Sequence, residues 1–362
     1  MDNEKHLEVN DIIIQLQQVD WMWILPILSP IISYYVTKKV ANSYILHKEY
    51  KPKNIKSVVL PPELIPKYSD IDEEKILAQE FGEAVLEFAK FMIDKFQPEN
   101  LINFYNNINE LMVSQKSDFK SKGTNGTYNI KKNKIDVKDK FPVYHELFHM
   151  ASSIFKKDCL YSGFSQAILK PKIINLGDGI NEGYTQLLTN RYFKNVASDK
   201  IYPYLVLVAG NLELVVGQEK MEKLYLNADL LGLINELKKY ISESEIMQFI
   251  AAMDFVKYCD ISEKTIFDKK DMLVRSLKTI SNFLIRIYAE KLICQIEEEK
   301  ITRQEAVDEL AKYTSSLGCA ITIGKHRYEY LTVKGLEEIF SGVLPRFQVA
   351  SKSIETSTKH GK

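Results

Sequence analysis

The sequence has little that would mark a secreted, fibrous or nucleic-acid-binding protein. It contains only four cysteines in 362 residues, and they lie far apart without any C-x-x-C pair. This spacing argues against a disulfide framework and against a cysteine zinc knuckle, and it fits a reducing compartment. Gly (15) and Pro (11) are too few for a collagen-like or low-complexity chain. Lys plus Arg (48) balances Asp plus Glu (48), so we expect no nucleic-acid partner.

Long uncharged runs are also scarce, which makes residues 21–37 conspicuous, with the sequence WMWILPILSPIISYYVT. As a helix this run would be about 25 Å long, slightly short of a bilayer core. Tryptophans open it, tyrosines close it and lysines follow, as at the two interfaces of a membrane-spanning helix. We predict a membrane anchor with the rest of the chain in the cytoplasm, because the lysines follow the run. Pro26 and Pro30 favour the alternative, a buried or interfacial segment of a cytoplasmic protein.

The pattern of polar, apolar and proline residues divides the chain into consecutive segments. Apolar residues recur at three- and four-residue steps through most of the longest segment, which predicts helices. The segments are a polar N-terminal stretch (1–20), the predicted anchor (21–37), a basic, proline-containing linker (38–67), a folded domain (68–348) and a small polar tail expected to be disordered (349–362).

One short region of the folded domain is predicted to be β structure. Tyr128 and Ile130, then Ile135 and Val137, alternate with polar residues on either side of a Lys-Asn turn. This pattern predicts a β-hairpin directly ahead of the motif described next. Together with the helical periodicity elsewhere, it predicts an α+β fold that is mostly α-helical.

The segment FPVYHELFHMAS contains the pattern H-E-x-x-H, formed by His145, Glu146 and His149. Residues four apart lie on one face of a helix, so both imidazoles can reach one Zn²⁺. Glu146 would then lie beside a metal-bound water, as in zinc metallopeptidases. The alternative is a pair of core histidines on an apolar helix, but the glutamate between them favours the metal site.

A third ligand is needed, because catalytic zinc usually has three protein ligands and an open position for water. The segment GDGINEGYTQ predicts a loop followed by a helix, with Glu182 in the first helical turn, where a carboxylate also suits the helix dipole. Gln186 follows one turn later and could hydrogen-bond a ligand histidine. Gly183 would let two helices approach closely. Glu182 could instead be an ordinary surface glutamate at a helix start.

The two segments together resemble the gluzincins, the thermolysin-like branch of the zincin metallopeptidases. Those proteins combine an H-E-x-x-H helix with a later helix carrying N-E, whose glutamate completes the zinc site. In this chain the matching positions are His145, Glu146, His149, Asn181 and Glu182. Where thermolysin-like enzymes tend to have aspartate one turn later, this chain has glutamine.

The resemblance implies a zincin-like catalytic domain over residues 68–348, with Glu146 as the catalytic base. It also implies an edge strand that binds extended peptide, for which the hairpin strand with Ile135, Asp136 and Val137 is the candidate.

We therefore expect a zinc-dependent metallopeptidase, and specifically an endopeptidase, acting on a peptide or protein substrate. The oxyanion of such a reaction needs an additional donor, for which we favour His326 because the other histidines outside the motif lie near the termini. The alternative function is a catalytically inactive, zinc-stabilised, membrane-associated scaffold of the same fold. Retention of Glu146 argues against the scaffold, since a structural zinc site does not need that carboxylate.

Overall fold

The computed structural model describes residues 70–119, 125–156, 159–169, 174–195, 201–261, 263–318, 320–323, 326–331 and 333–360. The polar N-terminal stretch, the predicted anchor at 21–37 and the whole linker at 38–67 lie outside these residues, so their assignments stay predictions. Among the described helices, none combines the length and the apolar character needed to cross a membrane.

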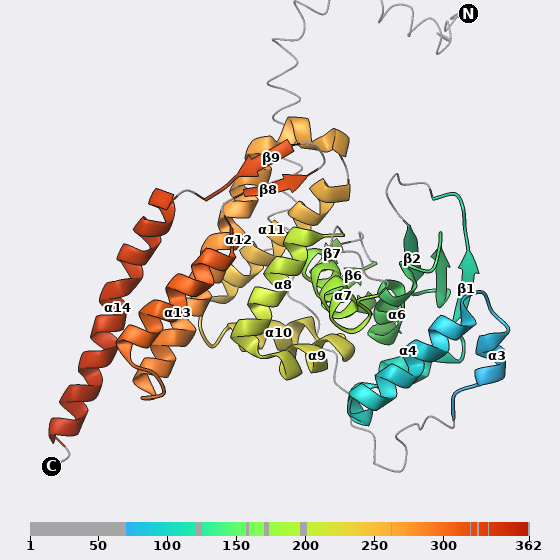
Figure 1. Cartoon of the computed structure of the whole chain (residues 1–362), viewed down its shortest axis with the longest axis horizontal. Helices are drawn as coiled ribbons and strands as arrows, with labels where there is room; N and C mark the ends of the chain where they lie inside the picture. Colours follow the sequence, from blue (N-terminus) through green and yellow to red (C-terminus); the bar gives the residue numbers. More distant parts are fainter. Residues whose placement is uncertain are drawn as a thin grey trace, which may run out of the picture. The chain divides into compact units, whose positions relative to one another are not determined.

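The described residues form a mostly helical α+β structure, in agreement with the fold class predicted from the sequence (Figure 1). The helices are α3 (Glu73–Leu77), α4 (Gly82–Lys95), η3 (Pro98–Asn100), α5 (Ile102–Ile108), α6 (Val143–Ala151), α7 (Asp178–Tyr192), α8 (Pro203–Val216), α9 (Gln218–Leu226), α10 (Leu230–Leu237), α11 (Glu243–Ile261), α12 (Glu263–Glu297), α13 (Arg303–Ser316) and α14 (Val333–His360). The strands are β1 (Met112–Gln115), β2 (Gly126–Asn129), β3 (Lys134–Val137), β4 (Ser153–Lys156), β5 (Cys159–Ser162), β6 (Ser165–Ile168), β7 (Ile174–Leu176), β8 (Ala320–Ile323) and β9 (His326–Glu329).

The predicted hairpin is present as β2 and β3, which pair antiparallel with Tyr128 opposite Ile135. However, β3 is the central strand of a three-stranded sheet, because β1 pairs with its other side in parallel. The prediction that Ile135, Asp136 and Val137 form a substrate-binding edge strand is therefore wrong, since both sides of β3 carry strand partners. The edge strand that contacts α6 is β2.

A second sheet, in the order β4-β5-β6-β7, was not predicted from the sequence. All its neighbours pair antiparallel, and its strands are only three or four residues long. Strands of that length give too few alternations to be recognised from periodicity. The sheet directly joins the two helices that carry the predicted ligands, since β4 begins just after α6 and β7 ends just before α7.

Helix α6 is fixed in place by its burial and by aromatic packing. All nine of its residues, from Val143 to Ala151, are buried. Phe148 contacts Phe88 of α4 edge-on, with ring centroids 5.0 Å apart, and Tyr144 stacks on Phe193 at 4.3 Å. Large buried rings of this kind hold a helix in one position, because any shift would open voids between them. The histidines on α6 are therefore presented from a rigid element.

Helix α7 packs against α8 at an unusually short distance. A Cβ atom built on Gly183 would lie 2.4 Å from the backbone oxygen of Leu205 in α8. Gly183 does allow a close helix approach, but the neighbour is α8 and not α6, the helix for which the approach was predicted. This contact fixes the helix turn that carries Glu182.

The prediction of a disordered tail at 349–362 is contradicted by helix α14. Helix α14 continues through residues 349–360, whereas 361 and 362 lie outside the described residues. Elongation of a formed helix adds one hydrogen bond for each residue ordered, and no proline occurs after Pro345 to interrupt it. Small polar composition alone was therefore a poor guide here.

Candidate metal centre

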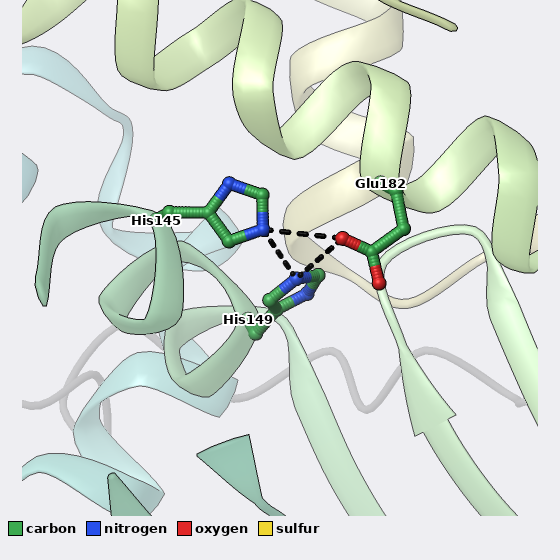
Figure 2. A group of neighbouring side chains, drawn as sticks. All are labelled: His145, His149 and Glu182. Atoms are coloured by element: carbon green, nitrogen blue, oxygen red, sulfur yellow. Dashed lines mark hydrogen bonds and ion pairs between the residues drawn. The ribbon is translucent and has the colours of Figure 1, made fainter. Parts of the chain in front are cut away.

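The predicted metal ligands come together at one point between α6 and α7 (Figure 2). Nε2 of His145 lies 3.1 Å from Nε2 of His149. Oε2 of Glu182 lies 3.2 Å from the first of these nitrogens and 3.5 Å from the second. Both histidines are buried and Glu182 is largely buried, with a side-chain exposure of 17%. Two helices from different parts of the chain thus bring three potential ligand atoms to one place.

The spacing of these three atoms fits a tetrahedral metal ion. Zinc binds imidazole nitrogen and carboxylate oxygen at about 2.0–2.1 Å, so two ligand atoms of a tetrahedron are about 3.3–3.4 Å apart. The observed separations of 3.1, 3.2 and 3.5 Å scatter around this value. Two imidazoles and one carboxylate are also a donor set that zinc accepts in hydrolases. The group is therefore suited to a transition-metal ion and leaves one tetrahedral position for water.

Neighbouring amide side chains orient both histidines. Oε1 of Gln186 lies 2.9 Å from Nδ1 of His145, so a proton on Nδ1 is donated to Gln186 and the lone pair of Nε2 faces the other ligands. The structure thus places Gln186 where the sequence suggested, next to a ligand histidine. Nδ2 of Asn181 lies 3.3 Å from Nδ1 of His149. Oδ1 of the same side chain accepts a hydrogen bond from the backbone N–H of Phe164. The sequence offered Asn181 only as part of the N-E pair.

Glu146 lies beside the ligands in a buried position, with 7% of its surface exposed. Burial raises the pKa of its carboxyl group above the ordinary value, and the nearby imidazoles only partly counteract this effect. The backbone N–H of Tyr128 in β2 faces the carboxylate and lowers its pKa by a smaller amount. A Cβ atom on Gly126 would lie 2.8 Å from Oε1 of Glu146, so the edge strand approaches the carboxylate closely. A raised pKa makes the carboxylate a stronger base than an exposed glutamate.

Glu182 has a further partner that sequence reasoning missed. Nζ of Lys257 in α11 lies 3.2 Å from Oε1 of Glu182. Burial raises the pKa of the Glu182 carboxyl, but Lys257 and the two histidines outweigh this effect, and the pKa lies well below its ordinary value. Glu182 is therefore an anion, as a metal ligand must be. No local pattern could have revealed Lys257, which lies 75 positions further along the chain.

The predicted oxyanion donor is not brought to this group by any described contact. His326 begins β9, but its side chain lies outside the description of the structure. Its role stays a prediction. The aromatic residue that does approach the ligands is Tyr202 at the start of α8, whose ring centroid is 6.4 Å from that of His145.

Comparisons with protein-family models, with curated proteins and with solved structures find no match to this chain. The resemblance to gluzincins therefore depends on residues 145–149 and 181–182 alone. The structure adds that these two segments, which are separated by a four-stranded sheet, meet with their ligand atoms within 4.8 Å of one another. What is shown is a buried group of two histidines and a glutamate that could hold a metal ion.

Proposed function

We propose that this protein is a zinc-dependent metallopeptidase that hydrolyses peptide bonds within peptides or proteins. The observation that carries the proposal is the tetrahedral spacing of His145, His149 and Glu182, with the buried Glu146 beside them. A purely structural metal site would not require a second, unligated carboxylate at this position. The zincin fold and the identity of the metal as zinc belong to the same proposal.

The chain's own residues would divide the work of hydrolysis. When bound, Zn²⁺ supplies Lewis acidity that activates a water molecule and polarises the scissile carbonyl. A carboxylate oxygen of Glu146 accepts the proton of the attacking water and then delivers it to the leaving amine.

The binding of an extended peptide is assigned to β2 rather than to β3. Strand β2 is the edge of its sheet and contacts α6, which carries Glu146. An edge strand offers unpaired backbone groups to which an extended peptide can add. Such a peptide would run past the Glu146 carboxylate, which β2 approaches at Gly126, so the bond to be cleaved and the base would be close together.

A cavity of about 340 Å³ that shares Tyr202 with the surroundings of His145 suits a substrate with apolar side chains. Tyr202 lines this cavity and also lies against His145, and Val256 lines it one residue before Lys257. Among the residues that the structure describes, none that lines it is charged. Its other walls include Leu205 and Ile321, so the cavity favours uncharged, bulky groups.

The proposal is tested by metal analysis and peptide cleavage on the full chain. We expect one zinc ion per chain and cleavage of a mixed peptide library, with activity falling in proportion to the zinc removed by a chelator and returning on addition of zinc. Cleavage products are identified by mass spectrometry. Stoichiometric zinc without cleavage of any peptide would support the inactive scaffold instead, and a chain that binds no transition metal would refute both functions.

The cavity gives a separate prediction on specificity. Substituting Ile321→Trp fills part of the cavity, so it should lower kcat/KM about tenfold or more for peptides with a bulky apolar residue beside the cleaved bond. Peptides with alanine at that position should be affected little. The exposed Leu214 in α8 provides the control substitution Leu214→Trp. Equal losses for both peptide classes would show that the cavity does not select the substrate.

A further inference from the structure

The two oxygens of the Glu182 carboxylate lie in different environments. Oε2 faces the nitrogens of His145 and His149, at 3.2 and 3.5 Å. Oε1 points to Nζ of Lys257, 3.2 Å away. A carboxylate can bind a metal through one oxygen or through both. The direction of Oε1 therefore decides how many coordination positions Glu182 occupies.

Lys257 is itself firmly held. Its side chain is only 18% exposed, and Nζ also lies 3.7 Å from Oδ2 of Asp178. A buried ammonium group is costly unless carboxylates surround it. The burial and both partners therefore fix the charge at one place, on the side of Glu182 that faces away from the histidines.

The same helix also fixes the backbone that carries Glu182. Asp254, one turn before Lys257 on α11, accepts hydrogen bonds from the backbone N–H groups of Gly177 at 3.0 Å and Gly179 at 2.8 Å. These amides belong to the start of α7, where N–H groups have no partner within the helix. Asp254 thus fixes the first turn of α7, and Lys257 fixes the side chain that this turn presents.

We propose that Lys257 is a positioning residue of the metal centre, which holds Oε1 of Glu182 so that only Oε2 binds the metal. Single-oxygen binding keeps the fourth coordination position open for water, as hydrolysis requires. The inference rests on the metal centre of the proposed function, but not on turnover. Without the ammonium, Oε1 is free to turn to the metal, and Asp178 and Glu182 face each other without a cation between them.

The test is zinc affinity of the full chain, measured by competition with a chelator, for wild type and Lys257→Met. We expect about 10- to 100-fold weaker binding in the variant. Replacement of zinc by Co²⁺ gives a second measurement, because visible absorption weakens when four-coordinate cobalt becomes five-coordinate. We expect that weakening in Lys257→Met. The control is Lys238→Met, which removes an exposed lysine paired with Glu243 at 2.9 Å and should leave both measurements unchanged.

A second variant covers the possibility that Lys257→Met does not fold because Asp178 is left buried and unpaired. The double substitution Lys257→Met with Asp178→Asn removes that charge as well, and should keep the weak zinc binding and the altered cobalt spectrum. Wild-type affinity and spectrum in the double variant would overturn the proposal and leave Lys257 as a counter-ion of Asp178. A wild-type chain without zinc would refute the metal centre itself, whereas zinc binding without peptide cleavage would refute only the peptidase.

Discussion

Replacement of Glu146 by glutamine should lower kcat for peptide cleavage by about 10²- to 10⁴-fold while the metal stays bound. The substitution keeps the size and shape of the side chain. The ligands His145, His149 and Glu182 are untouched. What is lost is the ability to take a proton from water and return it to the amine. The measurement is kcat and zinc content on the same preparation.

The control for this experiment is Glu83→Gln, which removes an exposed carboxylate from the first turn of α4. It should leave kcat and zinc content unchanged. If Glu146→Gln retains full activity with zinc bound, Glu146 is not the base. If it loses zinc together with activity, the carboxylate contributes to metal retention, and the kinetic result alone would not assign it a role in proton transfer.

The parts of the site that lie within one helix could be predicted from the sequence. Residues four apart lie on the same face of a helix, which places His145 and His149 side by side. That inference needs no knowledge of the fold. Gln186 follows Glu182 by four positions, so both point toward the same side of α7. Each inference depends only on a helix being present. The meeting of α6 and α7 was suggested by the gluzincin resemblance and not by these patterns.

The parts that depend on long-range pairing could not be predicted. Strand β3 reads as half of a hairpin, but its second partner is β1, which pairs in parallel from about 20 positions earlier in the chain. Parallel pairing leaves no local turn signal, so an interior strand was taken for an edge. Lys257 and Asp254 were missed for the same reason, since an α11 residue reaches Glu182 only through the packing of α7 against α11.

Because the site depends on helix packing, a substitution at Gly183 should also have a large effect. In Gly183→Ala the new Cβ would lie 2.4 Å from the backbone oxygen of Leu205, well inside van der Waals contact. A backbone atom cannot rotate away as a side chain can, so α7 and α8 must separate. We expect the free energy of unfolding to fall by about 1–3 kcal/mol or more. The measurement is the midpoint of thermal unfolding, which should be lower than in the wild type. Zinc affinity should fall too, because the displaced turn carries Glu182.

The matched control is Gly210→Ala in the neighbouring helix α8. A Cβ atom built on Gly210 meets nothing within 4 Å, and the residue lies in a helix interior. Alanine should therefore raise the free energy of unfolding by about 0.5–1 kcal/mol, since it restricts the unfolded chain more than glycine does. The same glycine-to-alanine change should thus lower the free energy of unfolding in α7 and raise it in the adjacent helix α8. A thermal midpoint raised by both substitutions would mean that α7 and α8 lie further apart than described, and Glu182 would then lack the rigid support on which its ligand position depends.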